Sequence, residues 1–136
     1  MTRIAIIDDD QSHLDLAAIL FGSRDWTTTT VPEGTALVDS LRCSRPDAIL
    51  LDIRLGRGQS GWDILDQLQS EPETNAIPVV IWSADIPGIN EKRDWLERRG
   101  IPVLSKPFEI DDLFRCVEQV LPEDSHRETD LLERSA

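Results

Sequence analysis

The chain has 136 residues, of which 40% are hydrophobic and 29% are charged, and its formal net charge at pH 7 is -12. This length and composition are typical of one soluble globular domain. The negative charge argues against nucleic acid or an anionic membrane as a direct partner and favours a cationic surface or a bound metal cation. No apolar segment has membrane length and no signal peptide precedes the first predicted strand, so we expect a cytoplasmic protein.

The first half of the chain alternates apolar runs with segments of helical character. Strands are predicted at residues 2–7, 26–31 and 48–51. The first and third are apolar on both faces, as in a parallel sheet covered by helices, whereas the second contains four threonines and suits a position close to an edge. One helix is expected between Ser12, its N-cap, and Gly22, and another from residues 32–34 to the residue before Pro46. Six residues are assigned to the apolar face of the first helix: Leu14, Leu16, Ala17, Ile19, Leu20 and Phe21.

The second half continues the same alternation. Strands are predicted at residues 77–82 and 101–104, and helices from residue 62 to Glu71-Pro72, at residues 90–99 and at residues 111–121. Asn90 is expected to cap the second of these helices, which is short and polar, and acids at Asp111 and Asp112 suit the start of the last one. We therefore expect one domain over residues 1–122, followed by a flexible polar tail over residues 123–136.

A strand followed by a helix, repeated five times, predicts an α/β fold: a flavodoxin-like (βα)5 doubly wound parallel sheet with the strand order 2-1-3-4-5. The carboxyl ends of all strands meet at one edge of such a sheet, and ligands bind there. Polar residues follow the first, third, fourth and fifth strands: Asp8 and Asp9, Asp52, Ser83, and Lys106. We therefore expect carboxylates, a hydroxyl and an ammonium to lie together at this edge.

The clustered carboxylates indicate a cation site, because like charges repel one another unless a cation lies among them. Asp9 and Asp52 as direct ligands, with Asp8 acting through water, suit an octahedral, water-rich Mg²⁺. A metal ion and an ammonium also neutralise the charge that develops on a phosphoryl group. Asp52 is then a candidate nucleophile that forms an acyl phosphate, with a hydrogen bond from Ser83 and an ion pair with Lys106.

These residues match the pattern of a known family. From Thr2 to Leu121 the chain resembles the receiver domain of two-component response regulators, whose motifs occur here in order and at similar spacing as Asp8-Asp9, Asp52, Ser83-Ala84 and Lys106-Pro107-Phe108. The resemblance implies a single-domain response regulator in which Asp52 accepts a phosphoryl group. The donor would be a sensor histidine kinase or a histidine phosphotransfer protein, and the output a conformational change or phosphorelay.

The resemblance also implies the roles of individual residues. Asp8, Asp9 and Asp52 would bind Mg²⁺ together with the backbone carbonyl of Arg54, and Ser83 and Lys106 would assist phosphoryl transfer. The chain would be a phosphoacceptor with self-catalysed phosphotransfer and autodephosphorylation rather than an enzyme. A homodimer through the fourth helix, fifth strand and fifth helix is a further expectation, with no nucleic acid and no membrane as partner.

Three features depart from the family pattern. Val103 stands three residues before Lys106, where the family usually has an aromatic residue that couples the site to the surface. The loop between Asp52 and Gly61 is one residue longer than is typical. Arg54 and Asp85 occupy two positions that resemble sites controlling phosphoryl lifetime, and we hypothesise that they pair across the pocket.

The same residues allow two other interpretations, a phosphatase and a receiver that only binds partners. Asp8 and Asp10 resemble the nucleophile motif of haloacid-dehalogenase-type phosphatases, with Ser83, Lys106 and Asp111-Asp112 as the later motifs, but this interpretation leaves Asp52 unexplained. A degenerate receiver that only binds partners would lack an acid or the lysine, and none is missing. His13 and His126 are expected on the solvated surface, and Cys43 and Cys116 are expected to be reduced packing residues.

Overall fold

The structure is a computed structural model, and it describes residues 2–31, 37–53, 60–84, 86–106 and 108–121. The sheet has five parallel strands, β1 Arg3–Ile7, β2 Thr27–Thr30, β3 Ala48–Asp52, β4 Val79–Ser83 and β5 Val103–Ser105, in the order β2-β1-β3-β4-β5. The predicted fold and strand order are confirmed. The threonine-rich β2 lies at one edge and the fully buried β3 at the centre, because only a central strand covered on both faces can bury every side chain.

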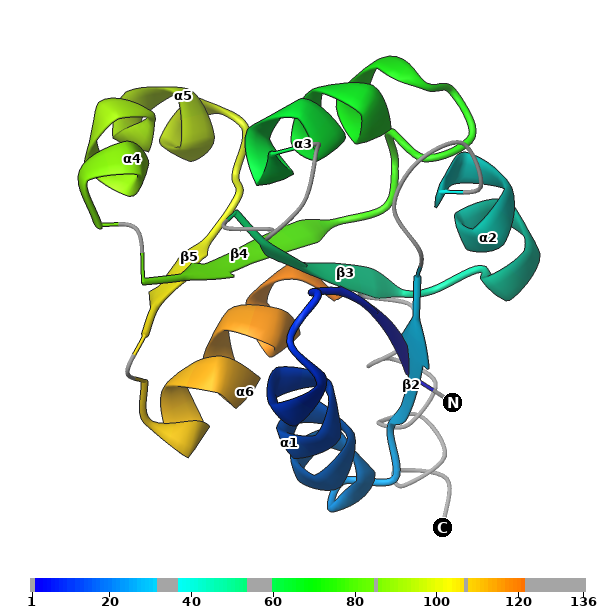
Figure 1. Cartoon of the computed structure of the whole chain (residues 1–136). Helices are drawn as coiled ribbons and strands as arrows, with labels where there is room; N and C mark the ends of the chain where they lie inside the picture. Colours follow the sequence, from blue (N-terminus) through cyan, green and yellow to red (C-terminus); the bar gives the residue numbers. More distant parts are fainter. Residues whose placement is uncertain (1, 32–36, 54–59, 85, 107, 122–136) are drawn as a thin grey trace, which may run out of the picture.

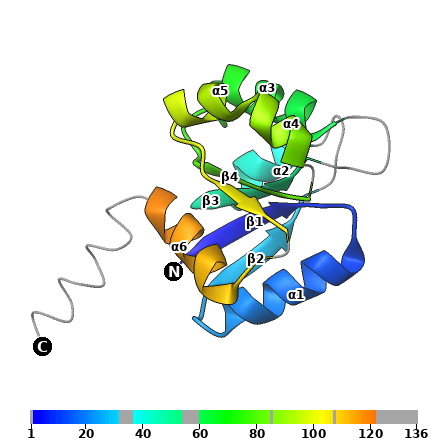
Figure 2. The same cartoon turned by 90° about the vertical axis from the view of Figure 1, so that its left-hand side faces the viewer.

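The helices form a layer on each face of the sheet (Figures 1 and 2). Their bounds are α1 Gln11–Gly22, α2 Leu37–Ser44, α3 Gly61–Ser70, α4 Ile86–Glu91, α5 Arg93–Arg98 and α6 Ile110–Val120. α1 and α6 lie on one face, and α2 to α5 lie on the other (Figure 1). Two apolar cores follow from the strand alternation: Ile49 and Leu51 join one, and Leu50 joins the other.

The structure corrects the prediction for the first helix in two respects. Ala17 and Phe21 are buried, but Leu16 is 45% exposed and Ile19 is 70% exposed. Six apolar residues within eight positions cannot all share one face of a helix with 3.6 residues per turn. The N-cap is Asp10 rather than Ser12, because the Asp10 side chain accepts a hydrogen bond from the Ser12 backbone N–H.

The predicted helix from Asn90 to Arg99 is replaced by two short helices, α4 and α5, which meet at Lys92. Asn90 lies inside α4 and does not cap a helix. Pro87 occupies the first turn of α4, where its fixed φ and missing N–H are tolerated. Residues 85–88 were predicted to form a loop, whereas Ile89 and Leu96 are buried and Leu96 packs in the core that covers one face of the sheet.

Within the described residues no helix is long and apolar enough to cross a membrane. The predicted start of the second helix at residues 32–34, the predicted stop at Pro122 and the tail lie outside the described residues. The domain boundary at residue 122 therefore stays a prediction.

Candidate functional site

Charged side chains from β1, β3 and β5 meet at the carboxyl edge of the sheet. The Lys106 Nζ lies 3.3 Å from Oδ2 of Asp52 and 3.6 Å from Oδ2 of Asp8. The side chains of Asp8, Asp52 and Lys106 are 0%, 7% and 16% exposed. Water screens buried charges poorly, so the single ammonium attracts both carboxylates strongly.

Asp52 is held in place by the helix that follows it. The Gly61 backbone N–H donates to the Ile53 carbonyl at 3.0 Å. A Cβ on Gly61 would lie 2.4 Å from Cα of Ile53 and 2.5 Å from the carbonyl oxygen of Asp52. Only glycine permits this approach of α3 to the end of β3, so the N-terminus of α3 fixes the backbone behind the Asp52 carboxylate.

Asp8 is positioned by the turn that leads into α1. Its Oδ1 accepts a hydrogen bond from the Asp10 backbone N–H at 2.9 Å. The Asp10 carboxylate in turn accepts from the Ser12 hydroxyl and the Ser12 backbone N–H. These two hydrogen bonds, that of the hydroxyl first, lower the pKa of the Asp10 carboxyl, so Asp10 is an anion next to the site at neutral pH.

His13 belongs to this site, and the prediction that it is solvated surface is wrong. Its Nδ1 lies 3.0 Å from Oδ2 of Asp8 and 3.1 Å from Nζ of Lys106. The ring also packs edge-to-face against Trp82, with 5.9 Å between centroids. His13 is the third residue of α1, and helical side chains lean toward the helix N-terminus. The sequence pattern did not mark His13, because its contacts with Asp8 and Lys106 depend on how the first turn of α1 lies against the sheet edge.

Ser83 is completely buried at the end of β4. Its backbone carbonyl accepts a hydrogen bond from the Lys106 N–H at 2.9 Å. Ser83 is paired in register with Ser105 on β5, while its neighbour Trp82 is paired with Asp52 on β3. Ser83 therefore lies between the strands that carry the acceptor and the lysine.

Two predicted metal ligands are not placed in this group. Asp9 is exposed, and the three residues whose ligand atoms lie within 4.8 Å of one another are Asp8, His13 and Asp52 among those that the structure describes. Arg54 lies outside the described residues, as does Asp85, so the predicted pair between them is not described. Pro107 and the residues 54–59 of the longer loop also lie outside.

The donor set fits a divalent cation. Asp8 and Asp52 present carboxylate oxygens, which are the ligands that Mg²⁺ prefers. The two carboxylates approach one another closely enough that a bound cation would relieve their repulsion. The described residues thus provide two of the four predicted oxygen ligands at one point.

Aromatic side chains close the inner side of the site. The Nζ of Lys106 lies 4.6 Å from the centroid of the Trp82 ring, within cation–π range. Phe108 is tilted against Trp82 with centroids 6.0 Å apart. Val103 occupies the position at which the family usually has an aromatic residue. It packs against the core that contains Ile49 and Leu51, whereas Trp82 belongs to the core on the other face of the sheet.

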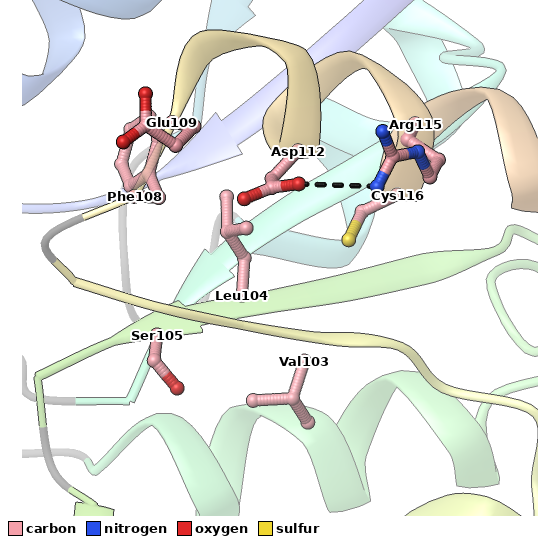
Figure 3. A pocket seen from close by; sticks show the side chains of 8 residues that line it. All are labelled: Val103, Leu104, Ser105, Phe108, Glu109, Asp112, Arg115 and Cys116. Atoms are coloured by element: carbon pink, nitrogen blue, oxygen red, sulfur yellow. Dashed lines mark hydrogen bonds and ion pairs between the residues drawn. The ribbon is translucent and has the colours of Figure 1, made fainter.

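A separate pocket of about 470 Å³ lies between β5 and α6. Figure 3 shows its lining, which is formed by Val103, Leu104, Ser105, Phe108, Glu109, Asp112, Arg115 and Cys116. The Arg115 guanidinium donates to Asp112 at 3.2 Å across one wall (Figure 3). The lining does not include Asp8, Asp52 or Lys106, so the pocket is a second surface rather than part of the charged site.

Comparisons with known proteins agree with this geometry. The family model described as the response regulator receiver domain matches residues 4–118. The C4-dicarboxylate transport transcriptional regulatory protein DctR of Rhodobacter capsulatus is 35% identical over 107 residues, which are 77% of this chain and 52% of that protein. The DNA-binding response regulator MtrA of Mycobacterium tuberculosis is 28% identical over 111 residues, which are 82% of this chain and 46% of that protein.

Among solved structures, the receiver domain of the sensor histidine kinase PA1611 from Pseudomonas aeruginosa PAO1 has a TM-score of 0.71 and 22% identity. The match covers 88% of this chain and 96% of that one, and that structure has a magnesium ion in its active-site cleft. At this identity the likeness shows the fold alone. The chain spans about half the length of the curated relatives it matches.

Proposed function

Because the chain belongs to the response regulator receiver domain family, we propose that it signals by accepting a phosphoryl group on Asp52. The donor is the phosphohistidine of a sensor histidine kinase or of a histidine phosphotransfer protein. The observation that carries the proposal is the contact of 3.3 Å between the Lys106 ammonium and the Asp52 carboxylate, next to the buried Asp8.

The reaction is a transfer between two nucleophiles. A carboxylate oxygen of Asp52 attacks phosphorus, the P–N bond of the phosphohistidine breaks, and the imidazole leaves with the bonding electron pair. The Lys106 ammonium neutralises charge on a phosphoryl oxygen, and the Ser83 hydroxyl donates a hydrogen bond to another. Asp8, Asp9, Asp52 and the carbonyl of Arg54 would hold Mg²⁺, which would supply further neutralisation of phosphoryl charge.

The phosphoryl group then changes the balance of charge at the edge of the sheet. It adds about -1.5 to -2 charges, which draws Ser83 and Lys106 inward and moves the ends of β4 and β5. The acyl phosphate is later hydrolysed at the same site, which ends the signal. The output is this conformational change or the passing of the phosphoryl group to another phosphorelay protein.

The proposed partners are proteins rather than nucleic acid or membrane. The net charge of -12 disfavours binding to a polyanion. DNA binding is a property of MtrA, which is about twice as long as the matched region. We also propose that the chain acts in the cytoplasm.

We also propose that a second copy of the chain docks on the face formed by α4, α5, β5 and α6. The pocket of Figure 3 lies on this face and combines an apolar floor with the paired charges of Asp112 and Arg115. A two-fold axis brings the same patch of each copy together, so Arg115 of one copy can face Asp112 of the other. Light scattering of the phosphorylated protein tests this: Arg115→Glu should prevent dimerisation, and a monomeric wild type would refute it.

The phosphatase interpretation has little geometric support. Asp10 caps α1, and Asp112 is in the first turn of α6, where it accepts from Arg115. Neither carboxylate belongs to the group of Asp8 and Asp52.

The test of the proposed function is the mass of the intact protein after incubation with Mg²⁺ and acetyl phosphate, followed by peptide mapping. We expect one phosphoryl adduct on Asp52 that is lost in Asp52→Asn and retained in the matched control Asp15→Asn on α1. An adduct on Asp8 with rapid release of phosphate would support a phosphatase. The absence of an adduct with acetyl phosphate and with histidine kinases would overturn the proposal.

A further inference from the structure

We propose that His13 supplies a nitrogen ligand to the divalent cation held by Asp8 and Asp52, and that Asp10 orients its ring. The site would then prefer a first-row transition-metal ion, such as Mn²⁺ or Co²⁺, to Mg²⁺. This inference rests on the proposed function for the presence of a cation site, and it adds a ligand and a metal preference to that site.

The first argument is convergence. A ring nitrogen of His13 and carboxylate oxygens of Asp8 and Asp52 lie within 4.8 Å of one another, and Nδ1 of His13 lies 3.0 Å from Oδ2 of Asp8. These groups already surround one cation, because Nζ of Lys106 lies 3.1 Å from Nδ1, 3.3 Å from Oδ2 of Asp52 and 3.6 Å from Oδ2 of Asp8. The geometry thus presents three electron-pair donors to a single positive charge.

The second argument concerns the atoms that face the Nδ1 of His13. Nδ1 lies 3.1 Å from Nζ of Lys106, which can only donate, and 3.0 Å from Oδ2 of Asp8. In the tautomer whose ring proton lies on Nε2, Nδ1 and the Asp8 oxygen both present lone pairs to the same region. A cation that both atoms contact would offset the repulsion between these lone pairs.

The third argument is the carboxylate on the other side of the ring. Oδ2 of Asp10 lies 3.5 Å from Nε2 of His13, within ion-pair distance. Histidines that ligate metals usually direct their other ring N–H to a carboxylate or carbonyl, which fixes the tautomer and raises the basicity of the ligating nitrogen. Asp10 is itself held by two hydrogen bonds from Ser12. A carboxylate therefore lies next to Nε2 of His13, the ring nitrogen that does not face Asp8 and Lys106.

The ring has little freedom to leave this position. It packs edge-to-face against the buried Trp82, and its side chain is 34% exposed. The remaining exposed part leaves room for water, which an octahedral ion needs to complete its shell.

The metal preference follows from the donor atoms. Mg²⁺ binds oxygen ligands and gains little from an imidazole, whereas Mn²⁺, Co²⁺ and later ions of the row accept imidazole nitrogen increasingly well. Replacing one oxygen or water ligand by Nδ1 of His13 therefore raises the affinity for the transition metals relative to Mg²⁺.

The experiment is a metal titration of the full chain without any phosphodonor. Calorimetry with Mg²⁺ and Co²⁺ is carried out on the wild type and on His13→Leu, Asp10→Asn and Asp15→Asn. We expect His13→Leu to lower the Co²⁺ affinity by at least about tenfold and the Mg²⁺ affinity by less than about threefold. Asp10→Asn should lower the Co²⁺ affinity by a smaller factor, while keeping its capping oxygen. Asp15→Asn, which removes the same charge elsewhere on α1, should leave the preference unchanged.

A spectroscopic measurement on the wild type tests the inference without relying on the stability of a variant. Electron spin-echo modulation of Mn²⁺ bound to the wild type should show a coordinated ¹⁴N nucleus, and the signal should be absent in His13→Leu. A wild-type spectrum without ¹⁴N coupling, or equal losses of Co²⁺ and Mg²⁺ affinity in His13→Leu, would overturn the inference. Phosphorylation of Asp52 in Mg²⁺ is measured separately, so the proposed function can stand while the inference fails. Failure of the wild type to bind any divalent cation would overturn both the inference and the Mg²⁺ part of the proposed function.

Discussion

The ammonium of Lys106 lies 3.3 Å from Oδ2 of Asp52, although 54 positions separate the two residues in the sequence. Asp52 is the last residue of β3 and Lys106 follows β5, and β4 lies between these strands. One positive charge thus faces two carboxylates, those of Asp52 and Asp8. Because of this imbalance of charge, we expect an added cation to stabilise the edge of the sheet.

Lys106→Met should lower the free energy of unfolding by about 2 kcal/mol without metal, because the Asp52 carboxylate loses a charged hydrogen-bond donor and the Asp8 carboxylate loses an ion-pair partner. Added Mg²⁺ or Mn²⁺ should restore most of this loss. Chemical denaturation with and without the metal measures both effects. The matched control is Lys92→Met, since Lys92 is exposed and directly precedes α5. This substitution should change the free energy of unfolding by less than about 0.5 kcal/mol. An equal loss in both variants would refute the explanation.

Gly61→Ala should destabilise the protein by at least about 2 kcal/mol, because the new methyl group meets the backbone of two residues. Its Cβ would lie 2.4 Å from Ile53 Cα and 2.5 Å from the Asp52 carbonyl oxygen. Displacement of this backbone should also lower the rate at which Asp52 accepts a phosphoryl group. Thermal denaturation and the intact-mass assay measure the two effects.

The control for that substitution is Gly22→Ala at the end of α1, where a Cβ meets nothing within 4 Å. Alanine has the higher helix propensity, so this variant should be more stable than the wild type by up to about 1 kcal/mol. A similar loss of stability in the two variants would show that the close approach at Gly61 is not the cause.

Trp82 should report phosphorylation through its fluorescence. It is 1% exposed, and its Nε1–H has no acceptor in the part of the chain that the structure describes. Lys106 Nζ lies 4.6 Å from the ring, so a phosphoryl group that draws the ammonium away changes the field at the indole. Emission should change on addition of acetyl phosphate in the wild type and stay constant in Trp82→Phe. Unchanged wild-type emission, with the adduct present, would contradict the expected movement of Lys106.

Cys116 should react more slowly with iodoacetamide than Cys43. The alkylation rate of Cys116 should also begin to rise at a higher pH than the alkylation rate of a free thiol. Burial, and then the nearby Asp112, raise the pKa of the Cys116 thiol, so less thiolate is present at a given pH. Cys43 is exposed. Peptide mapping after timed alkylation between pH 7 and about 10 measures both rates.

Cys116 also lines the pocket of Figure 3. If a phosphorylated second copy covers that pocket, alkylation of Cys116 should slow further on phosphorylation, and Arg115→Glu should remove this protection. Equal rates for Cys116 before and after phosphorylation would count against docking on this face.

The sequence alone determined the order of the strands, because four strands are continuous apolar runs, the other is a run of β-branched threonines, and the segments between them carry polar or helix-breaking residues. The same alternation placed Asp8, Asp52, Ser83 and Lys106 at strand ends. Since the carboxyl ends of parallel strands share one edge, the convergence of these residues followed from the topology.

Only the tertiary structure decided the role of His13 and the split between α4 and α5. A histidine in an amphipathic helix has no periodicity that reveals its partner, and its contact with Lys106 spans 93 positions of the sequence. The break at Lys92 depends on how Ile89 and Leu96 are buried against the sheet, and local propensity does not contain that information. Long-range contacts of single side chains therefore set the chemistry of a site whose position the chain's periodicity had already determined.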